Sequence, residues 1–281
     1  MSVPPTRQER SPVSPALHRL WASVAAITHP GLARPRNEDA ILVGTWWSQD
    51  RLEVPRTSQV SLRTPLLCLV ADGLGGHGGG DAASRLAVEA LSREPERLGR
   101  GESAIHAALL AIHQRLLSAI ARSPGQSAPG TTVAGLVLGQ QQAWVFNVGD
   151  SRVYRYRDGF LDQLSTDDVP NPSYGDTDEG RTSHRITQCL GICDEPPAPH
   201  IQRRAAADGD LFLLCSDGLT AMLDIDTIEA IIAAEPATNL GATVAALTQA
   251  ALTAGGLDNM SIILVRSEAR GGCGDGPDLS R

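Results

Sequence analysis

The chain has 281 residues, of which 42% are hydrophobic, so it can bury the core of one large domain. A formal net charge of −8 and only four Trp, three Tyr and three Phe residues argue against a nucleic-acid surface, which needs cations for phosphates and rings for bases. All 24 basic residues are arginine, and without lysine the chain cannot be a P-loop NTPase, a protein kinase or a pyridoxal enzyme built on a Schiff base.

Cysteine usage and hydropathy predict a cytoplasmic protein. The five cysteines are odd in number and two lie in apolar runs, which is typical of reduced thiols. Cys189 and Cys193 have a spacing that zinc could use, but no second Cys or His pair at zinc-site spacing follows. No apolar run approaches the ~20 residues of a membrane span, and the N-terminal segment lacks the apolar core of a signal peptide.

Composition divides the chain into a leader, one domain and a tail. Residues 1–18 are rich in Pro, Ser and Arg and predict a disordered leader, and the glycine-rich residues 268–281 predict a disordered tail. Residues 19–267 form the single predicted domain. Its strand-like runs are Ala22–Thr28, Ala40–Trp46, Leu66–Val70, Thr132–Leu138, Ala143–Val148, Arg152–Tyr156, Leu211–Cys215 and Ser261–Val265.

Helical periodicity separates the strand-like runs into groups. Asp81–Arg93 and Ser103–Arg122 predict one pair of helices. Asp226 with Glu229 resembles a capping box that starts a third helix, and Asn239–Ala254 predicts a fourth. Strand meanders joined by helix pairs favour an α+β layered domain over an alternating βαβ domain.

The acidic residues are informative because they fall at the ends of the most apolar runs. Asp72 and Asp217 each follow such a run, and Asp258 precedes the last one. If that last strand is antiparallel to its neighbours, the three carboxylates share one sheet edge. Two further strand candidates also carry acids at an end, namely Asp150 and the pair Glu38 and Asp39.

Such a cluster predicts bound cations. Neighbouring carboxylates raise one another's pKa values unless a cation compensates. A ligand set made only of oxygen favours Mg²⁺ or Mn²⁺ over zinc. Between two such ions a bridging water loses a proton near neutral pH and becomes a nucleophile, so hydrolysis is the expected reaction.

Neighbouring residues indicate which bond is hydrolysed. Arg34 lies four residues before Glu38, and its planar guanidinium can hold two oxygens of a phosphate. In the glycine-rich stretch after Asp72, the Gly73 carbonyl can serve as a ligand. His77 in the same stretch can protonate a leaving alkoxide. The sequence therefore predicts phosphate-ester hydrolysis.

Six segments, taken in order, form a specific signal. These segments are RPRNEDA at 34–40, VADGLGGHGGG at 70–80, GTTVAGLVL at 130–138, VFNVGDSRVYRYRDG at 145–159, LFLLCSDGL at 211–219 and DNMSIILV at 258–265. Together they resemble the protein phosphatase 2C family of metal-dependent Ser/Thr protein phosphatases, especially its bacterial branch. The resemblance extends from about residue 22 to 267.

The resemblance implies a four-layer αββα sandwich of two antiparallel sheets flanked by helix pairs. It also implies two Mn²⁺ or Mg²⁺ ions and a third, weaker ion. Asp72 is expected to bridge the first two ions and Gly73 to bind the first through its carbonyl. The remaining positions carried over are Glu38, Asp217 and Asp258 on the second ion, Asp150 with Asp217 on the third, and Asp39 and Asn259 as supporting neighbours.

The same resemblance implies roles for the substrate-binding residues and for partners. Arg34 matches the arginine that grips phosphate, and His77 matches the proposed general acid. The implied substrate is a protein carrying phosphoserine or phosphothreonine, and the implied partner is a Ser/Thr kinase whose action the enzyme reverses. We expect a monomer.

One segment departs from the family pattern. The usual Leu-Thr-x-Asp-His sequence is Leu164-Ser165-Thr166-Asp167-Asp168 here, so an aspartate replaces the expected histidine. The flap at 165–190 is shorter than usual. Because that region contributes to substrate choice, the sequence does not identify the phosphoprotein or the pathway.

Three other interpretations of the residues compete with these. The stretch Gly73–Gly78 fits the GxGxxG pattern of a dinucleotide-binding oxidoreductase, but Asp72 would repel a pyrophosphate and strands and helices do not alternate. A phosphatase-like binding module without turnover is the second alternative, and the intact acidic positions argue against it. His106 and His113 are seven residues apart on one predicted helix, where we interpret them as residues at the edge of a buried face rather than ligands.

Overall fold

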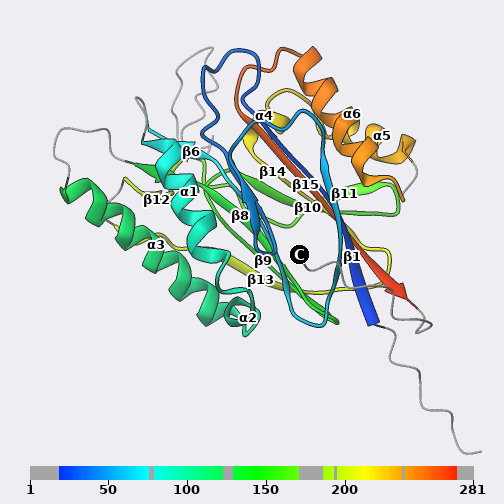
Figure 1. Ribbon diagram of the computed structural model, residues 1–281, viewed down its shortest axis with the longest axis horizontal. Helices are drawn as coiled ribbons and strands as arrows, with labels where there is room; N and C mark the ends of the chain where they lie inside the picture. The colour runs from blue at the N-terminus through cyan, green and yellow to red at the C-terminus, as the bar shows by residue number, and fades with distance from the viewer. Residues whose placement is uncertain are drawn as a thin grey trace, which may run out of the picture.

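The computed structural model describes residues 19–75, 79–122, 129–170, 186–192, 195–235 and 238–270. They form two large antiparallel sheets packed face to face, with helices covering the outer face of each sheet (Figure 1). The predicted α+β fold of two antiparallel sheets with flanking helices is confirmed. The predicted leader at 1–18 and residues 271–281 of the predicted tail lie outside the described residues.

Each large sheet has six strands. The first sheet has the order β11 (Phe160–Gln163), β10 (Arg152–Arg157), β14 (Leu211–Cys215), β15 (Met260–Arg270), β1 (Arg19–His29) and β4 (Arg56–Ser61). The second has the order β13 (His200–Ala205), β9 (Gln142–Val148), β8 (Val133–Leu138), β5 (Leu66–Ala71), β2 (Ala40–Val43) and β3 (Trp46–Ser48). A small sheet joins β12 (Leu190–Gly191), β7 (Gly130–Thr131) and β6 (Gly73–Leu74).

Two groups of helices complete the layers. The second sheet packs against α1 (Gly80–Leu91), α2 (Pro95–Leu98) and α3 (Glu102–Arg122). The first sheet packs against α4 (Asp217–Thr220), α5 (Ile225–Ala234) and α6 (Leu240–Thr253). The three hydrophobic clusters therefore lie between the sheets and on each outer face, as expected when both faces of a central sheet are apolar.

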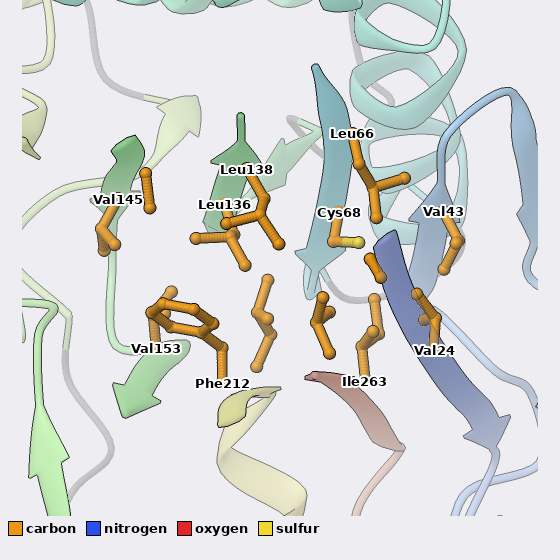
Figure 2. Packing of buried hydrophobic residues seen from close by; sticks show 14 of the residues in the cluster. Val24, Val43, Leu66, Cys68, Leu136, Leu138, Val145, Val153, Phe212 and Ile263 are labelled. Atoms are coloured by element: carbon orange, nitrogen blue, oxygen red, sulfur yellow. The ribbon is translucent and has the colours of Figure 1, made fainter. Parts of the chain in front are cut away.

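The core between the sheets explains why the central strands are continuous apolar runs. Figure 2 shows Val24, Phe212 and Ile263 of the first sheet facing residues of the second, including Leu66 and Cys68. Strands β5 and β8 are buried along their whole length because a sheet covers one face and helices cover the other. Burial of one side chain such as Phe212 stabilises the fold by about 1.5–3 kcal/mol.

Strands at the sheet edges were not predicted. Strands β4, β11 and β13 are edge strands. Strands β4 and β11 are largely exposed and β13 is half-buried, so all three lack the apolar periodicity that identifies a strand. The run Ala40–Trp46 was predicted as one strand, but the chain turns at Gly44, which has a φ of +63°, and continues as β3. Glycine at this position allows the turn.

Two boundaries differ from the prediction. Helix α5 is capped by Asp224, whose side chain accepts from the Thr227 backbone N–H at 2.8 Å, and not by Asp226. Glu229 accepts instead from the Leu161 backbone N–H and so ties α5 to β11. Strand β15 pairs with β1 as far as Arg270, so the domain extends three residues beyond the predicted boundary at 267. Tertiary pairing outweighs the polar composition of that segment.

Candidate functional site

Five carboxylates line one cavity at an end of the sandwich. The cavity encloses about 630 Å³. Its carboxylates are Glu38, Asp72, Asp150, Asp217 and Asp258. Arg34, Gly73 and Asn259 also line it, so the cavity gathers every described residue of the predicted site except Asp39. The segment with His77 lies outside the described residues.

Antiparallel pairing brings these distant residues together. Ala40 at the start of β2 pairs with Ala71 at the end of β5, which places Glu38 beside Asp72. Cys215 at the end of β14 pairs with Ile262 near the start of β15, which places Asp217 beside Asp258. The expectation that the last strand is antiparallel to its neighbour is confirmed, and its start meets the end of β14.

Asp72 and Gly73 are held rigidly where β5 ends. The Asp72 backbone carbonyl accepts from the Thr132 backbone N–H and from the Thr131 hydroxyl, both at 2.9 Å. Any side chain at position 73 would clash, because a Cβ there would lie 2.3 Å from the Gly80 carbonyl oxygen. Burial, together with the nearby aspartates, raises the pKa of Asp72 well above its usual range.

Asp39 lies behind the cavity wall. It is completely buried, and its Oδ2 accepts from the Ser216 hydroxyl at 2.7 Å. Its Oδ1 has no hydrogen-bond partner among the described residues. Burial raises the pKa of Asp39 to about 7, and the charges of Asp217 and Asp258 add to the shift. A carboxylate that is buried and only partly hydrogen-bonded is costly in free energy unless a positive charge lies nearby.

Asn259 clamps the loop that carries Arg34 and Glu38. Its side-chain amide donates to the carbonyls of Pro30 and Arg36, at 3.0 and 2.8 Å, and its Oδ1 accepts from the Glu38 backbone N–H at 2.7 Å. The amide therefore uses both donors and the acceptor on one loop. All three of these contacts are with the loop backbone.

Asp217 occupies the first turn of α4. Ser216 precedes this helix as its N-cap residue, and Asp217 faces the cavity from the helix start. The helix and the segment before β15 touch so closely that a Cβ at Gly218 would lie 1.9 Å from the Asn259 carbonyl oxygen. Glycine at this position thus allows the backbone contact that sets Asp217 near Asp258.

Arg34 is ion-paired within the cavity. Its NH2 group lies 2.6 Å from Asp258 Oδ2, and this contact raises the pKa of Arg34. The arginine side chain remains 55% exposed, so the guanidinium can reach a ligand that enters the cavity. Burial raises the pKa of Glu38, and the negative charge of Asp81 adds to that shift.

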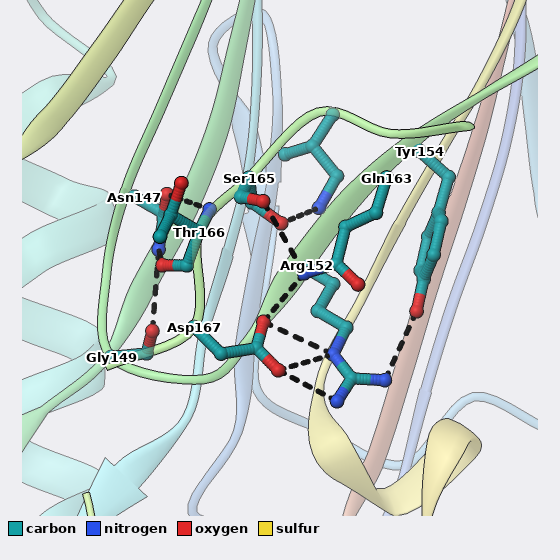
Figure 3. A network of polar contacts seen from close by, with 9 residues as sticks. Asn147, Gly149, Arg152, Tyr154, Gln163, Ser165, Thr166 and Asp167 are labelled. Atoms are coloured by element: carbon teal, nitrogen blue, oxygen red, sulfur yellow. Dashed lines mark hydrogen bonds and ion pairs between the residues drawn. The ribbon is translucent and has the colours of Figure 1, made fainter. Parts of the chain in front are cut away.

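A polar network supports the turn that carries Asp150 (Figure 3). The Asn147 amide donates to the carbonyls of Gly149 and Thr166 and accepts from the Thr166 backbone N–H. Arg152 pairs with Asp167 through two guanidinium nitrogens, the shortest contact being 2.7 Å. These contacts fasten the β9–β10 turn to residues 163–168, and this rigidity positions Asp150.

Asp168 was recognised from the sequence only as a departure, and the structure gives it a specific place. Its Oδ2 accepts from the Gly149 backbone N–H at 2.8 Å, next to Asp150. Its Oδ1 contacts Gln188 Nε2 at 2.8 Å and His200 Nε2 at 2.9 Å. Asp168 therefore connects the Asp150 turn to the segment beside Ile186, another cavity residue that the sequence analysis missed. Of the predicted flap at 165–190, residues 171–185 lie outside the described residues.

The alternatives have different outcomes. Every strand pairing among the described residues is antiparallel, which argues against a dinucleotide-binding domain with its parallel sheet. His106 is exposed, whereas His113 is buried and accepts from the Gly191 backbone N–H at 3.1 Å. Cys189 is buried, and Cys193 of the Cys-x3-Cys pair lies outside the described residues.

The cavity residues fit divalent cations in their chemistry. All the acidic donors are oxygens, the pKa of Asp72 is raised by burial and by its acidic neighbours, and Asp39 has an unpartnered buried oxygen among the described residues. Within the described ranges, no group of three or more His, Cys, Asp or Glu side chains has the arrangement of a formed metal site. Asp258 is instead paired with Arg34.

Comparison with known proteins decides the family. The family model described as Protein phosphatase 2C matches residues 46–251. The chain belongs to the protein phosphatase 2C family. A protein named "Putative protein phosphatase 2C-type" from Streptococcus pyogenes is 31% identical over 216 residues, which cover 72% of this chain and 86% of that protein. The source of this relative is a bacterium, in agreement with the predicted branch of the family.

Two further comparisons concern proteins named PstP. The Ser/Thr protein phosphatase PstP from Mycobacterium tuberculosis is 30% identical over 251 residues, 85% of this chain. The match covers 44% of that relative, so this protein phosphatase 2C chain spans less than half of its length. A crystal structure of the catalytic domain of a PstP, in complex with two manganese ions, superimposes with a TM-score of 0.71 at 28% identity and covers 89% of this chain and 99% of that one.

No helix in the described part of this family member is both long and apolar enough to cross a membrane.

Proposed function

We propose that this chain hydrolyses phosphoserine and phosphothreonine in proteins and thereby reverses the action of Ser/Thr kinases. The observation that carries the proposal is the cavity in which five carboxylates and Arg34 meet at one end of a protein phosphatase 2C fold. A relative named as a Ser/Thr protein phosphatase and another named as a putative protein phosphatase 2C-type protein support the same reaction.

The activity is proposed to need Mn²⁺ or Mg²⁺, two ions with a third, weaker one. Such ions supply a Lewis acid and a water that loses a proton near neutral pH. Asp72 and the Gly73 carbonyl would hold these ions together with Glu38, Asp217 and Asp258. Asp150 with Asp217 would hold the third ion. The manganese in the solved PstP domain supports this cofactor.

Arg34 is proposed to bind the phosphate group of the substrate. Its guanidinium is paired with Asp258, but it is half exposed at the cavity, so a phosphate can take the place of the carboxylate. Two oxygens of one phosphate match the planar guanidinium, which orients the phosphorus toward the carboxylates. His77 is the proposed general acid, which would give its proton to the leaving serine or threonine oxygen.

Asp39 and Asn259 are proposed to support the site without touching the substrate. Asn259 holds the backbone of the Arg34 loop, and Asp39 holds Ser216 at the start of α4. Positions of the reacting groups depend on such supporting contacts. The wider setting that we propose is a monomeric signalling enzyme of the cytoplasm that acts with a cognate Ser/Thr kinase.

The test measures phosphate release by purified protein from a phosphothreonine peptide and from p-nitrophenyl phosphate, with MnCl₂ and with EDTA. We expect turnover of both substrates in MnCl₂. In EDTA the rate should fall by at least ~10²-fold, because no cation then offsets the negative charge of the phosphate. A phosphotyrosine peptide of the same sequence should react more slowly. A pure, folded protein without any manganese-dependent rate would overturn the proposal and favour a binding module.

A further inference from the structure

A second cavity lies at the opposite end of the sandwich from the carboxylates. It encloses about 620 Å³, within the range of cavities that hold small ligands or short peptide segments. Its walls come from the turn before β5, the end of β8, the start of β9 and the end of β13, near α2 in Figure 1. Strand β9, with seven residues of about 3.3 Å each, spans roughly 20 Å between the two ends.

The second cavity is basic in an acidic protein. Arg63, Arg203 and Arg204 line it, and no Asp or Glu is among its lining residues. Arg63 and Arg203 are exposed, and neither guanidinium has an ion-pair or hydrogen-bond partner among the described residues. The chain as a whole carries a formal charge of −8, so this local positive charge is not a general property of its surface.

The unpartnered guanidinium and indole groups of this cavity are hydrogen-bond donors. Trp144 lies directly opposite Arg203 in the β9–β13 ladder. Its indole Nε1 is buried and has no hydrogen-bond partner in the described part of the chain. Indole and guanidinium groups can only donate hydrogen bonds, so a ligand that satisfies them must supply acceptors and negative charge. Arg204 is held beside them, because it donates to the Arg203 carbonyl at 3.1 Å.

We infer that this basic cavity binds an acidic peptide segment of the phosphoprotein substrate, distant from the phosphorylated residue. Carboxylates of the segment pair with Arg63 and Arg203, and one acceptor receives the Trp144 N–H. Leu62, Pro65 and Val137 supply apolar wall for the stems of the acidic side chains. The substrate role rests on the proposed phosphatase function, whereas binding of the acidic segment does not require catalysis.

The binding test uses the manganese-loaded full chain and a fluorescein-labelled peptide containing eight glutamates, followed by fluorescence anisotropy. The double variant Arg63→Gln with Arg203→Gln is compared with Arg51→Gln with Arg115→Gln. The second pair changes the net charge equally, and both of its arginines are exposed and line neither cavity. We expect the Kd to rise at least about tenfold in the first variant and at most about twofold in the control.

Equal weakening by both variants, or no weakening by the first, overturns the inference. A peptide with glutamine in place of glutamate should bind at least about tenfold more weakly to the unaltered chain, and equally tight binding also overturns it. NMR of the indole N–H protons tests the proposed contact with Trp144. Addition of the acidic peptide should shift the Trp144 N–H signal. An unmoved signal at saturation contradicts the proposed contact.

A kinetic measurement separates this inference from the proposed function. With a phosphothreonine peptide joined to the eight-glutamate tail, the Arg63 and Arg203 variant should have a raised KM and an unchanged kcat. Its kcat/KM for p-nitrophenyl phosphate should equal that of the unaltered chain. Absence of all turnover with intact peptide binding would refute the phosphatase proposal and leave the anion site standing.

Discussion

The two ends of the sandwich are built from the same strands but differ in how their charged residues are held. At the carboxylate end, the loops that carry the acids are tied by Asn259, Thr131 and Thr132 to backbone groups of other segments. At the basic end, Arg63 and Arg203 project from a turn and an edge strand without ion-pair partners among the described residues. The first end fixes the geometry of its side chains, which chemistry requires, whereas the second leaves them adaptable, as suits binding.

The carboxylate end also costs the folded chain more stability than the basic end does. Asp39 and Asp72 both have raised pKa values, because burial and neighbouring acids disfavour their charged forms. The exposed arginines of the basic cavity have no comparable burial. Buried like charges at one end only are the pattern expected when a reactive site is maintained at a cost in stability. The following variants test this contrast.

The largest effect is expected from removal of a central carboxylate. Asp72→Ala and Asp217→Ala should each lower kcat for p-nitrophenyl phosphate by at least ~10², because each removes a proposed metal ligand and the charge stabilisation that depends on it. Asp226→Ala is the matched control, since Asp226 is exposed on α5 and should change kcat by at most about twofold. Steady-state kinetics in MnCl₂ measures all three, and near-normal activity of both cavity variants would refute the assignment of the site.

A smaller effect is expected from Arg34→Ala. This variant should chiefly raise KM for phosphorylated substrates, by about tenfold, because one bidentate phosphate contact is worth about 1.4 kcal/mol or more. Arg115→Ala, an exposed arginine of α3, should leave KM unchanged. Initial rates over a range of substrate concentrations measure KM and kcat separately. An unchanged KM for Arg34→Ala would mean that the guanidinium serves Asp258 and not the substrate.

The smallest effect concerns stability and its dependence on pH. The pKa of Asp39 is about 7 in the folded chain and near 4 in an unfolded one, so the folded state retains a proton that the unfolded state has lost between these pH values. The stability contributed by this group is therefore present below pH 4 and is lost as pH rises to about 7. In EDTA, Asp39→Asn should lose less stability than the unaltered chain between pH 5 and pH 8, by about 1 kcal/mol or more.

Urea unfolding at the two pH values measures this difference. Asp162→Asn is a suitable control, because Asp162 is exposed on β11 and should leave the pH dependence as it is. Identical pH dependence of the Asp39 variant and the unaltered chain would show that burial of this carboxyl has no energetic consequence for folding.

The central strands and the acids at their ends could be predicted from residues alone. A strand buried on both faces, such as β5, is an apolar run, and a turn follows it directly, so Asp72 is identifiable by its position in the chain. Antiparallel pairing then predicts which strand ends meet. The same local patterns identified α1, α3 and α6 to within a few residues.

Edge strands and supporting contacts depended on the tertiary structure. The half-buried edge strand β13 has no apolar periodicity, and only its ladder with β9 sets Arg203 opposite Trp144. The contact of Glu229 with Leu161 and the partners of Asp168 likewise depend on segments far away in the chain. Residue order determined which acids stand at strand ends, because burial and turn chemistry are local properties. The meeting of charges and donors across strands was decided by register and packing, which no local pattern contains.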